Sequence, residues 1–334
     1  MSDLTNRYEI MALVEAKMCN PNGDPDMANR PRMDMQTGRS IITDVAFKAR
    51  MRRYVLDAYN GVSGLDILMK PGASLNMAIA ESVIDVNGGT PVKKGENRKV
   101  DEAASLMCSK YWDVRTFGAV LSTGLNAGQV RGAVQVGMSL SVDPVDAVVA
   151  SITRQCYTEG SFSTVAEYVA ADVARSDDAK RTMGDKAYIP YGLYVMKLTV
   201  SGNLARKVGF SEEDLKLLLE SVVQMYNNDV SSSKMGMSVL TPVIVFKHVG
   251  TNHGVSPEQT LREALLGCAP AYRLFDLLSV TRKDGIDAAR SHEDYNILLR
   301  LSDLPDGVVC GFKTLPFEDV KWLDVNDDID LLEL

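Results

Sequence analysis

The sequence predicts an α+β protein whose core follows the order strand, helix, strand, strand, helix, strand, the modified ferredoxin-like arrangement of RNA-recognition (RRM-like) folds. Two observations predict this class: apolar β-rich runs and capped amphipathic stretches occur in this order, and long insertions separate some of them. A chain of 334 residues with 46% hydrophobic and 24% charged residues can bury such a core. The expected core elements lie at 8–17, 43–60, 129–142, 191–202, 211–228 and 239–248.

The first half of the core, residues 1–61, combines a strand, a polar loop and a basic helix. Residues 8–17 are apolar and β-branched enough for a buried strand, which the Asn-Pro, Asn-Gly and Asp-Pro dipeptides then end in turns. A helix is expected to start at Thr43 or Asp44 and to stop at the Asn-Gly pair 60–61. Its apolar face is then formed by Val45, Met51, Tyr54, Val55 and Ala58.

The rest of the chain divides into insertions, a second core half and an extension. Residues 62–187 are predicted as inserted helices and loops, with a helix at 101–112 and a core strand near 129–142. Residues 188–280 complete the core with a strand, a capped helix and a closing strand. Residues 281–334 form a C-terminal extension with an acidic tail, "DVNDDIDLLEL", which we expect to be solvated. The second core helix should bury Leu215, Leu218, Leu219, Val222, Val223 and Tyr226.

Charge is distributed unevenly along the chain. The net charge of −8 argues against a bulk attraction to a polyanion. Between residues 30 and 53, however, seven Lys or Arg residues stand against Asp34 and Asp44, a local excess of 7 − 2 = +5. A local basic surface on an acidic protein is therefore expected.

Cysteine usage and hydropathy indicate the compartment. The five cysteines are scattered without a C-x-x-C pair, so neither a disulfide framework nor a cysteine zinc site is expected. The N-terminus lacks a signal-like pattern, and no apolar run approaches the ~18 residues of a membrane span. These features predict a cytoplasmic protein with no membrane partner.

The polar loop "CNPNGDPDMANRPRMDMQTGRS", residues 19–40, admits three interpretations. A calcium loop fits badly, because Pro25 and Pro31 occupy the positions of its required glycine and glutamate. A two-metal nuclease would need converging carboxylates, which Asp24 and Asp26 could supply, although aspartates of this kind more often form turns. The third interpretation is an anion site, because the loop leads into a helix N-terminus.

The basic helix after this loop could extend such an anion site. Ser40 and Thr43 precede the helix, and Lys48 and Arg52 lie four residues apart on one of its faces, with Arg53 nearby. The competing interpretation is that these cations are the solvated side of an amphipathic helix. The residues alone leave both possibilities open.

Catalytic signals are weak. The three histidines have no nearby Ser or Cys arrangement that suggests nucleophilic catalysis, and no zinc-protease, Walker A or dinucleotide-binding pattern occurs. A binding protein is therefore favoured over an enzyme, with no catalytic residue, metal or cofactor expected.

Three blocks of the sequence resemble a known family. They are "NPNGDPDMANRPRMDMQTGRSIITDVAFKARMRRYV", "YWDVRTFGAVLSTGLNAGQVRGAVQVGMSLSVDP" at 111–144, and the segment 181–248 with its Tyr-Gly-Leu-Tyr strand. Together they are similar to the backbone, CRISPR RNA-binding subunit of type I CRISPR Cascade complexes, most closely the I-C form, in the RAMP superfamily.

The resemblance implies a hand-like protein with a thumb hairpin that polymerises along CRISPR RNA. Each copy would hold the guide backbone, and the thumb would displace a nucleotide at intervals, so that the other bases can pair with target DNA. Implied partners are CRISPR RNA, target DNA, further copies of the chain, and the crRNA-end-processing, large and small subunits of Cascade. The resemblance implies a scaffold without catalysis.

The resemblance also implies contacts with the guide. The expected RNA-binding residues are Asn20, Asn22, Arg30, Arg32, Ser40, Thr43, Lys48, Arg52, Arg53, Arg115, Arg131, Lys180, Arg181 and Lys186. Two other functions stay open: a metal-dependent endoribonuclease like type III backbone subunits, using Asp24 or Asp26, and a general single-strand RNA chaperone.

Overall fold

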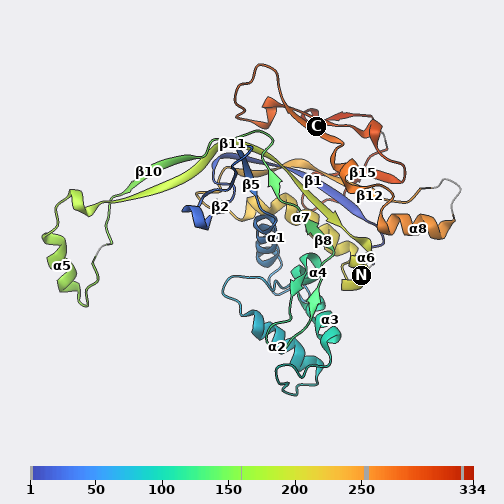
Figure 1. Ribbon diagram of the computed structural model, residues 1–334, viewed down its shortest axis with the longest axis horizontal. Helices are drawn as coiled ribbons and strands as arrows, with labels where there is room; N and C mark the ends of the chain where they lie inside the picture. The colour runs from blue at the N-terminus through green and yellow to red at the C-terminus, as the bar shows by residue number, and fades with distance from the viewer. Residues whose placement is uncertain (1–2, 159, 252–255, 325–326) are drawn as a thin grey trace.

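The computed structural model describes residues 3–158, 160–251, 256–324 and 327–334. Figure 1 shows a central sheet with helices on one side, a C-terminal segment on the other, and a long hairpin that projects away from the body. A separate lobe formed by part of the chain before residue 134 hangs below the helices. Among the described residues, no helix is both long and apolar enough to cross a bilayer.

The central sheet is antiparallel and is built around one strand, β1. Its path runs β10, β11, β1, β12, β15, β16, and β8 pairs with β11 beside this path. On β1, apolar residues point alternately to both faces, so almost the whole strand is buried. The strands are β1 (Tyr8–Cys19), β8 (Val134–Val136), β10 (Val148–Arg154), β11 (Thr182–Val200), β12 (Met237–His248), β15 (Val308–Lys313) and β16 (Lys321–Trp322).

The core strand predicted near 129–142 is present as β8 alone, and the prediction was too long. This segment forms three short strands with three different partners, because β7 pairs with β6, β8 with β11 and β9 with β5. Glycine explains the first break, since a Cβ on Gly132 would lie 2.3 Å from the backbone nitrogen of Gly118. The bounds are β5 (Arg39–Ile42), β6 (Ala119–Val120), β7 (Gln129–Val130) and β9 (Ser139–Leu140).

Two helices cover one face of the sheet, α1 (Asp44–Ala58) and α7 (Glu212–Asn228). Thr43 caps α1, and Ser211 forms a capping box with Asp214 at the start of α7. The predicted apolar face of α7 is buried throughout. On α1 the buried residues are Phe47, Met51, Tyr54 and Val55.

Two residues predicted on the apolar face of α1 are exposed instead. The spacing of the buried residues follows one helical stripe, which begins at Phe47. Val45 lies two positions before Phe47, on the other side of the helix, and is exposed. Ala58 lies on the same side as Tyr54, but it is the last residue of α1 and is exposed there.

The C-terminal extension covers the opposite face of the sheet. Its small sheet, β13 (Leu278–Arg282), β14 (Tyr295–Leu299) and β17 (Ile329–Asp330), shares a core with the outer face of β1, β11 and β12. The tail predicted to be solvated is therefore partly packed: β17 pairs with β14, and Leu331 is 9% exposed. Apolar residues alternate with the acidic ones at this end, so burial can hold the tail despite its charge.

Two parts of the chain project from this body (Figure 1). The lobe before β8 contains α2 (Leu75–Val86), α3 (Val100–Lys110) and α4 (Trp112–Phe117), and it has its own apolar cluster. The β10–β11 hairpin carries α5 (Val165–Val173), in which no residue is buried. Three further helices, α6 (Gly202–Val208), α8 (Pro257–Leu266) and α9 (Ala271–Phe275), complete the longer elements.

Candidate nucleic-acid interface

The loop after β1 is fixed to the start of α1 by side-chain hydrogen bonds. The backbone amide and the hydroxyl of Thr43 both donate to Asn22 Oδ1, at 2.9 Å. Asn20 Nδ2 donates to the carbonyl of Asn29 at 2.7 Å, across a small hairpin of β2 (Gly23–Asp24) and β3 (Arg30–Pro31). The two asparagines therefore position the loop, and this satisfies the polar groups that the turns expose.

Burial separates the predicted loop residues into two groups. Ser40 is fully buried, and its amide donates to Ser141 Oγ at 3.0 Å, while Asn20 is 4% exposed. Arg30 is exposed, and Arg32 is half-buried with its guanidinium 3.3 Å from Asp24. Of these four, only the arginines present charge at the surface.

Lys48 and Arg52, predicted as a pair of phosphate contacts, each have an acidic partner. Lys48 Nζ lies 2.8 Å from Asp44 one turn earlier. Arg52 Nε lies 2.8 Å from Asp113, which is 1% exposed and also accepts two backbone amides at 68 and 69. The Arg52 guanidinium also lies over the Phe117 ring, 5.1 Å from its centroid. These contacts indicate that Arg52 anchors the lobe to α1.

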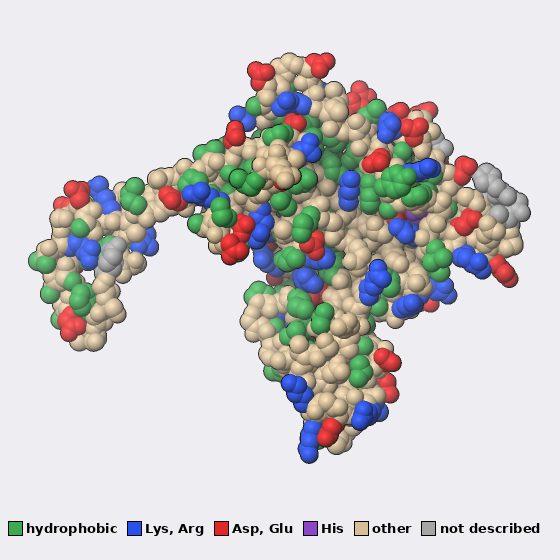
Figure 2. All heavy atoms as spheres, viewed as in Figure 1, with side chains coloured by type: hydrophobic (Ala, Val, Ile, Leu, Met, Phe, Trp, Pro, Cys, Tyr) green, Lys and Arg blue, Asp and Glu red, His purple; other side chains and the backbone are tan. Residues whose placement is uncertain are grey.

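A different group of cations gathers where α1, the base of the hairpin and the turn before β12 meet. We call Arg50, Arg53, Lys186 and Lys234 the basic junction. Figure 2 shows Lys and Arg side chains gathered in this part of the surface, between the hairpin and the lobe. The four cations come from three segments that lie far apart in the sequence.

The basic junction contains more positive than negative charge. Arg50 and Arg53 both pair with Asp229, the single carboxylate that the described residues place against these four cations. Lys234 donates to the carbonyls of Asn20 and Pro21, at 2.6 Å for the latter. Lys186 donates to the carbonyl of Ser232 at 3.3 Å. Among the described residues, the hydrogen-bond acceptors of Lys186 and Lys234 are thus neutral carbonyls.

The pKa of Lys234 reflects its burial and the neighbouring positive charge. Burial first, and then the positive charge of Arg50, lower the pKa of Lys234 to about 8. An anion placed at the junction would favour the charged form of Lys234 and offset the repulsion among the cations. The arrangement suits a phosphate group, which accepts several charge-assisted hydrogen bonds at once.

The remaining predicted cations lie elsewhere. Lys180 and Arg181 are beyond the far end of β11, beside α5, where Lys180 pairs with Asp172 at 3.1 Å. Arg115 is buried and forms a bidentate pair with Asp214, with nitrogen–oxygen distances of 2.7 and 2.9 Å. Arg131 is exposed.

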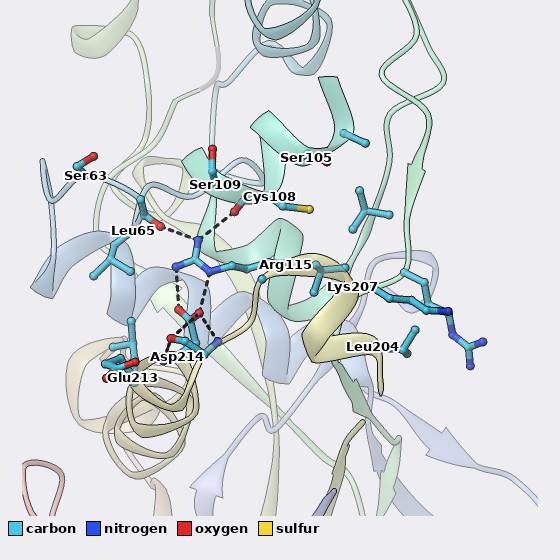
Figure 3. A pocket seen from close by; sticks show the side chains of 18 of the residues that line it. Ser63, Leu65, Ser105, Cys108, Ser109, Arg115, Leu204, Lys207, Glu213 and Asp214 are labelled. Carbon is cyan, nitrogen blue, oxygen red and sulfur yellow. Dashed lines mark hydrogen bonds and ion pairs between the residues drawn. The ribbon is translucent and has the colours of Figure 1, made fainter. Parts of the chain in front are cut away.

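Arg115 and Arg131 both line a cavity of about 1150 Å³ between the lobe and the α6–α7 region. Figure 3 shows the Arg115 guanidinium reaching across to Asp214 and to the carbonyl of Cys108. The Arg115 guanidinium thus joins Asp214 to the carbonyls of Gly64 and Cys108, which indicates a structural role for this residue. The predicted set is therefore spread over the loop, the helix α1, the junction, the tip of the hairpin and this cavity.

The aspartates proposed as metal ligands do not converge. Asp24 pairs with Arg32 and also accepts the amide of Asp26 at 3.1 Å, which caps a short turn. Asp26 itself is exposed. Within the part of the chain that the structure describes, no group of three or more His, Cys, Asp or Glu side chains could hold a metal ion.

One histidine does lie beside a cysteine, which the sequence did not indicate. His248 Nε2 is 2.6 Å from Glu9 and its Nδ1 is 3.3 Å from Cys268 Sγ. The same Nδ1 accepts the backbone amide of Cys268 at 3.0 Å, and the thiol donates to the carbonyl of Gly307. Burial raises the pKa of the Cys268 thiol. The histidine nitrogen is thus occupied and the thiol is disfavoured as a nucleophile.

Sequence reasoning missed Arg50 and Lys234. Arg50 belongs to the basic run on α1, so its charge is evident from the sequence. The segments that its side chain meets in the fold are not. Lys234 lies in "SSSKMG", where nothing in the pattern relates it to a loop more than two hundred residues earlier. Only the pairing of β1 with β12 brings the two segments together.

Comparisons with known proteins agree with one another. A family model described as "CRISPR-associated protein Cas7" matches residues 6–300. A protein of Haloferax volcanii with the same description is 26% identical over 257 residues, which cover 74% of this chain and 72% of that protein.

Two solved structures were also found. One, described as "CRISPR RNA-guided surveillance complex, pre-nicking", has a TM-score of 0.46 and 15% identity, and covers 79% of this chain and 84% of its own. Another, described as "CRISPR RNA-guided surveillance complex", has a TM-score of 0.44 and 14% identity, with 94% and 90% coverage. Since the family model spans most of the sequence, this chain belongs to the CRISPR-associated protein Cas7 family.

Proposed function

We propose that the protein is a guide-RNA-binding backbone subunit of a type I CRISPR surveillance complex, of the I-C kind, and acts without catalysis. The observation that carries the proposal is the basic junction, where Asp229 is the one carboxylate that the described residues set against four cations. A phosphodiester backbone supplies the missing negative charge. Bases held by their backbone stay free to pair with target DNA.

The arrangement of the sheet supports the same proposal. The order β8, β11, β1, β12, with α1 and α7 on one face, corresponds to a ferredoxin-like core. We assign the β10–β11 hairpin as the thumb, and Lys186 lies near its base. Copies of the chain polymerise along the guide and meet the end-processing, large and small subunits of the complex.

Charge distribution also supports it. Residues 281–334, the C-terminal extension, carry 13 acidic and 6 basic residues, a net charge of 6 − 13 = −7. The remaining residues therefore carry −8 − (−7) = −1. The extension lies on the face of the sheet opposite α1, so most of the net negative charge is kept on the far side of the sheet from that helix.

The test is the salt dependence of single-stranded RNA binding. The double variant Arg50→Gln/Arg53→Gln should bind more weakly and lose about 0.7 in the slope of log affinity against log salt for each phosphate contact removed. Asp229→Asn removes the opposing carboxylate and should strengthen binding. Lys216→Gln is a matched control, because Lys216 is exposed and pairs with Asp319 at 2.8 Å, away from the junction.

Circular dichroism and urea unfolding would check that each variant folds. The proposal is overturned if the wild-type protein binds no RNA, or if the double variant keeps both the affinity and the slope of the wild type.

A further inference from the structure

Asp229 lies at the end of α7, and its carboxylate lies between two arginines of α1. The Nη1 nitrogens of Arg50 and Arg53 both contact the same carboxylate oxygen, Oδ2. Among the described residues, these two arginines are the only side chains that donate hydrogen bonds to that carboxylate. One oxygen shared by two guanidinium groups is an arrangement that also suits a phosphate. The Asp229 side chain therefore occupies a place that a phosphate could take.

The position of Asp229 on its helix is unfavourable for a negative charge. Asp229 is the C-cap residue of α7, at the negative end of the helix dipole. The neighbouring Asn228 donates to Asp57 of α1 at 2.7 Å, so this end of α7 is fixed to α1 without the Asp229 carboxylate. The dipole opposes the two ion pairs, and this makes the carboxylate easier to displace.

The ion pairs of Asp229 also lie close to solvent. The Asp229 side chain is 18% exposed and that of Arg53 is 44% exposed. By contrast, Asp113, which pairs with Arg52, is 1% exposed and also accepts two backbone amides. A phosphate can therefore replace the Asp229 carboxylate without leaving buried backbone amides unpaired, whereas replacing Asp113 would leave two.

A carboxylate on the same chain competes differently with a free anion and with a phosphate in a polymer. A free phosphate must displace Asp229 from solution, and the tethered carboxylate competes at a high effective concentration. In RNA, contacts with Lys186 and Lys234 hold the chain, so the next phosphate is also tethered, at an effective concentration on the order of millimolar. A polymer can therefore displace a carboxylate that single anions leave in place.

We propose that Asp229 is a specificity-determining residue of the basic junction, an inference that rests on the proposed function. In the free protein it occupies the place of one phosphate and excludes free phosphate and mononucleotides. A phosphodiester chain displaces it. The junction thus selects nucleic acid by the connection between its charges, without a contact to any base.

Competition by inorganic phosphate at constant ionic strength tests the proposal. Binding of a labelled single-stranded RNA is measured in chloride, and again with part of the chloride replaced by about 10 mM phosphate. The wild-type affinity should change by less than about twofold. For Asp229→Asn, the affinity in chloride should rise, and phosphate should then lower it about threefold to tenfold, because no tethered carboxylate competes for the arginines.

Asp57→Asn is a matched control, because it removes the same charge one turn beyond Arg53 on α1. Asp57 is exposed, and its carboxylate accepts a hydrogen bond from Asn228, which an asparagine at position 57 can still accept. This variant should be as insensitive to phosphate as the wild type. Sensitivity equal to that of Asp229→Asn would show that total charge, and not the occupied place, excludes phosphate, and would overturn the inference.

Two results with Asp229→Asn would also overturn it. One is a phosphate sensitivity equal to that of the wild type. The other is weaker RNA binding by a variant that circular dichroism shows to be folded, which is the result that a purely structural role for Asp229 predicts. In both cases the wild type binds RNA and the proposed function stands. If the wild type binds no RNA, the proposed function fails, and the inference fails with it.

Discussion

Two groups of cations on the same helix have different surroundings. Lys48 and Arg52 each contact a carboxylate of their own, at 2.8 Å in both cases. Arg50 and Arg53 share Asp229 and lie near Lys234, whose partners are two carbonyls. The sequence of α1 presents all four as one basic run. Their partners, not their type, decide which of them can attract a phosphate.

Ion pairs have different effects at Arg52 and at the basic junction. The Arg52–Asp113 pair is largely buried and joins α1 to the lobe, so its main effect is on stability. The basic junction keeps an excess of positive charge close to solvent, with 44% of the Arg53 side chain exposed, so its main effect is on binding. Variants at the two places should therefore change different measured quantities.

The largest expected effect comes from removing the buried carboxylate. Asp113→Ala leaves the Arg52 guanidinium without its partner and two backbone amides without their acceptor. The free energy of unfolding, measured with urea, should fall by about 3 to 5 kcal/mol. Asp229→Ala should cost clearly less, because Asp229 itself is less buried than Asp113 and its partner Arg53 is 44% exposed. Equal losses for the two variants would contradict the contrast between the two groups.

A smaller effect is expected from pH at the junction. The pKa of Lys234 is lowered to about 8 in the free protein, and a bound phosphate should raise it, so RNA binding takes up a proton. Affinity should therefore fall as the pH rises through 8, by at most about tenfold per pH unit. The variant Lys234→Arg should flatten this dependence, because arginine stays charged.

Folding stability should respond to the same group with the opposite sign. The folded state disfavours charged Lys234, whereas the unfolded chain does not. Between about pH 8 and the usual pKa of lysine, the unfolded chain binds more protons, so this residue adds stability as the pH rises. A parallel change of affinity and stability across this range would show that another group titrates.

Local sequence patterns predicted the two core helices. They could not predict features that depend on contacts between distant parts of the chain. The apolar spacing on α7 predicted its buried face, because helix periodicity depends only on near neighbours. The break at Gly132 depends on the approach of Gly118, which no periodicity reveals. The strand predicted there therefore became three.

The candidate site was also predictable only where it depends on local sequence. The loop after β1 and the basic helix were recognisable from turn residues and charge. Which cations are neutralised could not be predicted, because Asp113 and Asp229 lie far along the chain from the arginines they meet. Lys234 was missed because only the pairing of β1 with β12 carries it to the loop.

The smallest expected effect is at Lys48, and it tests the contrast most directly. Lys48→Gln removes an i, i+4 pair with Asp44, which is worth about 0.3 to 0.5 kcal/mol in the free energy of unfolding. Because that charge is already balanced, RNA affinity and its salt slope should stay within about twofold of the wild type. The matched variant Arg53→Gln should weaken binding more, although it lies on the same helix. If Lys48→Gln lowers the affinity as much as Arg53→Gln, then both faces of α1 hold phosphate, and neutralisation by Asp44 does not decide the binding surface.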